Sequence, residues 1–123
     1  MLGKIHSVAI WTDDVGRLTA FYRDKLGLAL EMESDEFSVF AASSPGATQL
    51  ALGRHSNVSG RSKEPNRIMI DFLVKDCQAA YDDLRSRGVE FLREPGVDQA
   101  DGFMIATFQD PDGNTLQLFQ PPV

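Results

Sequence analysis

Aromatic, amide and charged side chains recur at every second position of the predicted strands. Because side chains alternate between the two faces of a strand, residues two apart share one face. We predict that one face is a mixture of small, polar and aromatic residues, namely Ser7, Ala9, Trp11, Gln49, Ala51, Arg67, Met69, Asp71, Thr115, Gln117 and Phe119. A solvated sheet face would instead be rich in Lys, Glu and Thr. The mixture favours a cupped, partly dry surface that holds a ligand, the alternatives being an oligomer interface or a wet sheet face.

Trp11 and Phe119 give this face flat aromatic surfaces, and Phe103 begins a predicted strand that would line its rim. Flat rings suit stacking on a planar ligand and attract a cation over the ring face. The amides of Gln49 and Gln117 would orient a ligand without ionising. We therefore expect a planar aromatic or cationic small molecule as the partner. The alternative for Trp11 is an ordinary core position.

Few ionisable groups lie on this face. Asp71 and Arg67 are predicted to be neighbours, and such a pair would either bind a polar ligand or neutralise itself. Asp71 is also a weak candidate for a catalytic base. His6 adjoins Ser7, so alternation turns it away from the face, and His55 lies in a polar segment that we expect to be exposed.

The elements that position these residues occur twice. Ser7–Asp14 and Met69–Asp76 each read as a strand that ends in an Asp able to cap a helix. About three helical turns with one apolar face follow each, and Gly27 or Gly88 ends them. We expect apolar residues on the other strand face to pack beneath the helices, namely Val8, Ile10, Leu50, Leu52, Ile68, Ile70, Phe72, Leu116 and Leu118.

Short strands follow each predicted helix. They are expected over residues 29–34, 36–42 and 48–52, and again over 89–93, 103–108 and 115–119. Asp110–Asn114 is a strong turn signal before the last strand. Residues 54–66 are polar, lack apolar periodicity and read as an exposed linker. The chain is thus predicted to be one α+β domain, 1–123, of two βαβββ modules, 1–53 and 67–123.

Composition limits the partners and the compartment. The formal charge of −6 argues against nucleic acid, whose phosphates require clustered Lys and Arg. No apolar run approaches the roughly 20 residues of a membrane span, and the first residues do not resemble a signal peptide. The single cysteine, Cys77, excludes an internal disulfide, and its place on a helix's apolar face predicts a small core residue. We expect a cytoplasmic protein.

Several segments, in this order and spacing, resemble the vicinal oxygen chelate (VOC) superfamily, the glyoxalase, bleomycin-resistance and extradiol-dioxygenase group. They are Val8–Ile10 with Asp14, Phe21–Tyr22, Leu26–Leu28, Val74–Asp76, residues 79–84 with Arg87–Phe91, and Asp110–Asn114. The resemblance covers nearly the whole chain. It implies two βαβββ modules whose mixed sheets curl around a central cavity, commonly in a homodimer.

Enzymes of that family usually bind a divalent metal through His and Glu on four strands. The resemblance places these four positions at Ser7, Gln49, Met69 and Gln117, with Ala51 replacing Gln49 if the register shifts by two. A hydroxyl, two neutral amides and a thioether are poor ligands for such metals, which prefer carboxylate oxygen or imidazole nitrogen. We therefore predict no metal and no other cofactor.

Three functions remain open. The favoured one is a metal-free protein that binds and sequesters a small molecule, as in the bleomycin-resistance branch. The second is a lyase, epimerase or dioxygenase with a divergent or metal-independent site, in which Asp71 would act as general base. The third is a regulatory or structural module whose cavity is filled by Met69, Phe119 and Trp11.

Overall fold

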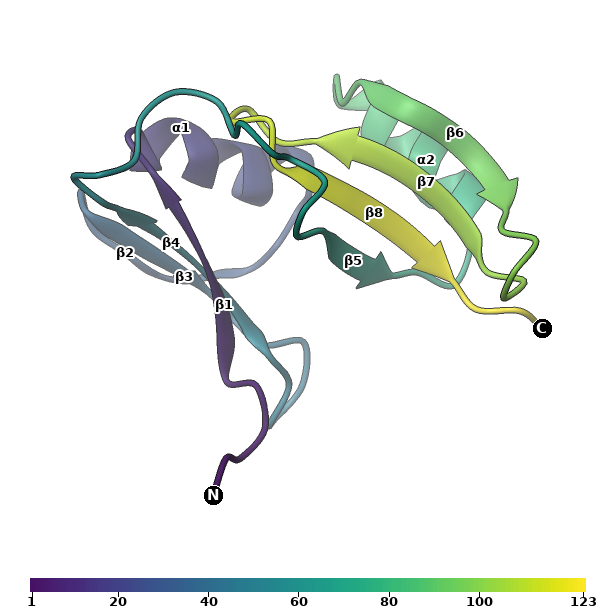
Figure 1. Ribbon diagram of the computed structural model, residues 1–123, viewed down its shortest axis with the longest axis horizontal. Helices are drawn as coiled ribbons and strands as arrows, with labels where there is room; N and C mark the ends of the chain where they lie inside the picture. Colours follow the sequence, from purple (N-terminus) through teal and green to yellow (C-terminus); the bar gives the residue numbers. More distant parts are fainter. The chain divides into compact units, whose positions relative to one another are not determined.

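The computed structural model describes all 123 residues and contains two four-stranded mixed sheets, each associated with one α-helix (Figure 1). The chain divides into two compact units, Met1–Gly60 and Arg61–Val123. The division falls inside the polar segment 54–66. Neither helix has the length and hydropathy that crossing a bilayer requires.

The first unit is a strand, a helix and three further strands. Its elements are β1 (Ser7–Thr12), α1 (Val15–Ala20), η1 (Phe21–Lys25), β2 (Leu30–Glu33), β3 (Phe37–Phe40) and β4 (Gln49–Arg54). The strand order is β1-β4-β3-β2, with β1 parallel to β4 and the remaining pairs antiparallel. This is the predicted βαβββ module.

The second unit repeats the pattern. Its elements are β5 (Ile70–Leu73), α2 (Cys77–Ser86), β6 (Phe91–Val97), β7 (Met104–Gln109) and β8 (Thr115–Gln120). The order β5-β8-β7-β6 again has one parallel pair, β5 with β8. The α+β class and the two βαβββ modules are therefore confirmed.

Both helices begin at the predicted caps. The Asp14 carboxylate accepts a hydrogen bond from the backbone N–H of Arg17, and Asp76 accepts one from Ala79. The first helix departs from expectation after Ala20, because it continues as the π-helical turn η1. Phe21 and Tyr22, the first two residues of this turn, are both buried.

The core of each unit lies between its helix and one sheet face. Fully buried members include Leu18, Tyr22 and Phe40 in the first unit, and Cys77 and Phe108 in the second. The predicted core role of Cys77 is confirmed. The prediction for Ile68 is wrong: this side chain is 77% exposed, because β5 begins only at Ile70 and Ile68 precedes the sheet.

Strand β6 is longer than the sequence predicts, since residues 94–97 belong to it and not to a loop. It is an edge strand, and its register against β7 shifts twice along its length. An edge strand accommodates Pro95 because one side of its backbone has no ladder partner, and bulges absorb the irregularity.

The polar segment 54–66 is largely exposed, as predicted, yet its backbone is tied down at its centre. The Gly60 N–H donates to Oδ2 of Asp13 at 2.8 Å. The Ser62 N–H donates to the carbonyl of Asp112, also at 2.8 Å. Each of these two hydrogen bonds lies within one unit. The polar segment is therefore anchored to the first unit at Gly60 and to the second unit at Ser62.

Candidate functional site

The sheet face of the first unit opposite α1 presents Trp11 to solvent. Burial along β1 alternates, with Ser7, Ala9 and Trp11 exposed and the residues between them more buried. Trp11 is 45% exposed, so the core alternative is wrong. Its ring meets His55 edge-on, with centroids 5.7 Å apart and planes at 74°. His55 is exposed, as expected, but it borders the site instead of standing apart.

Gly53 on β4 makes room for the indole. It lies opposite Trp11 in the parallel β1–β4 ladder and opposite Phe37 in the β3–β4 ladder. A Cβ atom at Gly53 would lie 2.5 Å from Cζ3 of Trp11 and 3.0 Å from Cδ1 of Phe37. The two rings therefore lie against the backbone of β4. Sequence reasoning missed Phe37 and Gly53, although a strand-interior glycine is a known sign of close approach.

Ser7 and Gln49 are direct partners across β1 and β4. This register places Gln49, and not Ala51, beside Ser7. The Gln49 amide Nε2 donates to Oε2 of Glu31 at 3.4 Å. Glu31 was not predicted here, because the register shift between Leu30 and Met32 interrupts simple alternation in β2. The first face therefore combines an aromatic group with a hydroxyl, an amide and one carboxylate.

The corresponding face of the second unit brings together four predicted residues. Asp71 and Gln117 are direct partners across β5 and β8. The Gln117 amide Nε2 donates to the Thr107 hydroxyl at 3.2 Å. The Phe103 and Phe119 rings are in contact, with centroids 4.9 Å apart. This face therefore has a polar part and an aromatic part.

Two predicted site residues, Arg67 and Met69, lie before β5, which begins at Ile70. The guanidinium of Arg67 pairs with Glu64, with Nη2 2.6 Å from Oε1. The predicted Arg67–Asp71 pair is therefore wrong, because a carboxylate three residues away is the nearer partner. Asp71 forms no ion pair. Its side chain is exposed, and desolvation by the atoms around it raises the pKa of its carboxyl above the ordinary value.

Residues 4–118 match the family model described as the Glyoxalase/Bleomycin resistance protein/Dioxygenase superfamily. The chain belongs to this superfamily. The protein YetH of Bacillus subtilis is 28% identical over 122 residues, which cover 96% of this chain and 98% of that protein. A lactoylglutathione lyase of Arabidopsis thaliana is 25% identical over 114 residues, covering 87% of this chain and 40% of the lyase.

Solved structures of the superfamily share the fold. A glyoxalase/bleomycin resistance protein/dioxygenase from Nocardioides superposes with a TM-score of 0.77 at 25% identity, covering 99% of this chain and 85% of that one. The expected family resemblance and fold are thus confirmed.

The superfamily's usual metal does not fit the donor set of this chain. The four positions that the resemblance assigns to metal ligands hold Ser7, Gln49, Met69 and Gln117, none of which offers an anionic oxygen or an imidazole nitrogen. The amide nitrogen of Gln117 is moreover engaged by Thr107. No group of three or more His, Cys, Asp or Glu side chains gathers elsewhere in the chain.

The raised pKa of Asp71 predicts a pH-dependent stability difference. Burial disfavours its carboxylate in the folded protein, so stability falls as pH rises from the ordinary pKa of 3.8 through the higher folded value. Asp71→Asn should therefore melt at a higher temperature than the parent at neutral pH, and the difference should vanish in acid. Thermal melts from about pH 3 to about pH 7 measure this. Asp35→Asn, in an exposed turn, controls for net charge; an equal gain there would contradict the prediction.

Proposed function

We propose that this VOC protein binds and sequesters a planar aromatic or cationic small molecule, with no metal and no catalysis. The observation that carries this proposal is the exposed indole of Trp11, which lies over Gly53 on a sheet face whose inherited metal positions hold Ser7 and Gln49. An indole that lies against the backbone of the neighbouring strand offers a flat surface to a ligand at little conformational cost. The same face holds one carboxylate, that of Glu31, and it has no cluster of three or more His, Cys, Asp or Glu side chains.

Stacking on Trp11 would supply about 0.5–1.5 kcal/mol beyond area burial, and a cation over the ring a similar amount. Gln49 and Glu31 lie farther along the same face, where an amide and a carboxylate would orient polar groups of the ligand. The second unit has its own proposed ligand-binding surface, formed by Phe103, Phe119 and the Asp71–Gln117 pair. Such a surface selects by shape and stacking.

Trp11 is the only tryptophan in the chain, so intrinsic fluorescence reports on this site alone. We expect proflavine, a planar cation, or acridine, its neutral relative, to quench this emission saturably. Calorimetry should show that Trp11→Ala weakens binding about tenfold or more, equivalent to at least about 1.4 kcal/mol. Trp11→Phe, which keeps a ring, is the matched control and should lose less. Unchanged affinity in Trp11→Ala would refute stacking at this site.

The same samples separate sequestration from catalysis. A sequestered compound is recovered unchanged after incubation, whereas turnover would contradict the proposal. Thermal-shift titrations with Mn, Ni, Zn and Fe test the metal, and tight stoichiometric stabilisation by one of them would overturn the metal-free assignment.

A metal-independent lyase is the second candidate function, and Asp71 is the observation that favours it. An unpaired carboxylate whose pKa is raised by burial is better suited to accept a proton than an ordinary one. The similarity to a lactoylglutathione lyase makes lyase substrates the first to test. Activity that disappears in Asp71→Asn while binding persists would support this candidate; activity of equal rate in the variant would exclude Asp71 as the base.

A further inference from the structure

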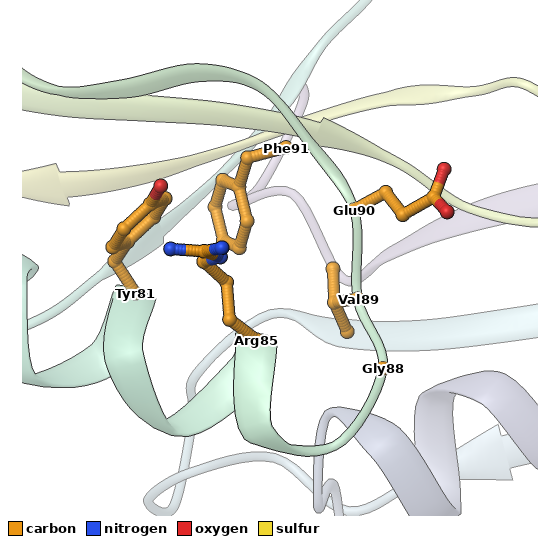
Figure 2. A pocket seen from close by; sticks show the side chains of 6 residues that line it. All are labelled: Tyr81, Arg85, Gly88, Val89, Glu90 and Phe91. Carbon is orange, nitrogen blue, oxygen red and sulfur yellow. The ribbon is translucent and has the colours of Figure 1, made fainter.

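The second unit has a pocket on its helix side, where α2 ends and β6 begins (Figure 2). Its volume is about 550 Å³, within the range of small-molecule sites. Six residues of one continuous stretch of chain line it: Tyr81, Arg85, Gly88, Val89, Glu90 and Phe91. None of them belongs to the sheet faces described above. The pocket is therefore distinct from the sheet faces that are proposed to bind a ligand.

Two hydrogen-bond donors at this pocket have no acceptor in the protein. The Arg85 guanidinium lies over the Tyr81 ring, with Cζ 5.3 Å from its centroid, and forms no ion pair or hydrogen bond. Its neighbour Arg87, by contrast, pairs with Asp83 at 3.3 Å. Stacking on a ring occupies the face of a guanidinium and leaves its N–H edges available for a bidentate acceptor. The Tyr81 hydroxyl is the second free donor.

The remaining walls are apolar or lack a side chain. The Phe91 ring meets Tyr81 edge-on at 4.6 Å, and Val89 is almost fully buried. Gly88 has a φ of 90° at the end of the helix and adds no side chain to the opening. The Glu90 carboxylate points away from Arg85, so it does not neutralise the guanidinium (Figure 2). The Arg85 guanidinium and the Tyr81 hydroxyl therefore lie beside the apolar side chains of Phe91 and Val89.

We propose that this pocket binds a small organic acid. Its carboxylate would accept hydrogen bonds from Arg85 and Tyr81, and its apolar body would lie on Phe91 and Val89. A carboxylate matches the two N–H groups of a guanidinium edge, and an apolar body gains from leaving water. Because the C-terminal end of a helix carries partial negative charge, Arg85 must supply the attraction for the anion. Removing Arg85 should therefore weaken the binding of the anion and reduce the preference for it over a neutral analogue.

The test is a titration of the ¹⁵N-labelled full chain with benzoate, followed by amide chemical shifts. We expect saturable shifts at Gly88, Val89 and Phe91, and an affinity at least tenfold lower for benzamide, the neutral analogue. Arg85→Gln should weaken benzoate binding about tenfold, and Tyr81→Phe, which keeps the ring, should weaken it by a smaller factor. Arg87→Gln is the matched control, since it removes the same charge two residues away, and should leave the affinity within twofold of the parent.

Several results would overturn the assignment. Shifts that do not saturate, equal binding of benzamide, or undiminished affinity in Arg85→Gln would each show that no carboxylate site exists here. Inorganic phosphate that binds as tightly as benzoate would show a general anion site and refute the role of Phe91 and Val89. The amide spectrum of each variant reports directly whether it has folded.

Discussion

Asp110→Ala is expected to lower the free energy of unfolding by about 3 kcal/mol or more. The carboxylate of Asp110 is nearly inaccessible to solvent, at 3% exposure. Oδ1 accepts from the N–H groups of Asp112 and Asn114 at 2.9 and 3.0 Å, and Oδ2 accepts from the Asn114 amide at 2.9 Å. Alanine would remove the acceptor of these donors, of which the Asp112 N–H is buried and the two of Asn114 are part-buried; a buried donor left without a partner costs about 1–3 kcal/mol.

Urea denaturation of the full chain measures this loss. Asp101 provides the matched control, because its carboxylate also accepts from a backbone N–H two residues on, that of Phe103 at 3.0 Å, but it is exposed. Asp101→Ala should cost less than about 1 kcal/mol. Asp110→Asn, which retains one acceptor oxygen, should lie between the two. A cost for Asp110→Ala similar to that of Asp101→Ala would show that the turn does not depend on its first residue.

The turn also has a partner that the sequence does not reveal. Arg61, predicted to lie in an exposed linker, donates from Nη1 to the Pro111 carbonyl at 3.3 Å and from Nη2 to Oε1 of Gln109 at 3.2 Å. A Cβ atom at Gly113 would lie only 2.8 Å from the same guanidinium. The local turn was predictable because Asp, Pro and Gly each favour it by their own geometry. Arg61 was not, because its contact joins residues about fifty positions apart.

The same distinction explains the outcome for the candidate site. Two faces were predictable, that of Ser7 and Trp11 in the first unit and that of Asp71, Gln117 and Phe119 in the second, since a period of two follows from strand geometry alone. Arg67 and Ile68 were misplaced because periodicity does not state where a strand begins.

Glu31, Phe37 and His55 were missed for other reasons. Glu31 follows a register shift in β2, and Phe37 and His55 reach Trp11 through tertiary contacts. The position of a strand and the face on which each of its residues lies follow from the local sequence. The residues that meet across a sheet depend on the register between strands. The pocket at Arg85 likewise depends on how one helix end meets the following strand.

Phe108→Ala and Phe119→Ala test whether the two faces of one sheet have different tasks. Phe108 on β7 is fully buried, and its ring contacts that of Phe91 at 5.1 Å. Phe119 on the adjacent strand β8 faces the other way, is only partly buried and contacts Phe103. Phe108→Ala should cost about 3–5 kcal/mol of unfolding free energy, the usual cost of a large cavity in a core.

Phe119→Ala should cost about 1 kcal/mol, because its ring already keeps part of its surface in water. Urea denaturation of both variants gives this ratio directly, and each is the control for the other. If Phe119→Ala cost as much as Phe108→Ala, the face opposite α2 would be a second core and could not serve as a ligand surface. A low cost for Phe119→Ala would instead separate the two tasks within this unit: the face covered by α2 would hold the fold together, and the opposite face would be free to bind a ligand.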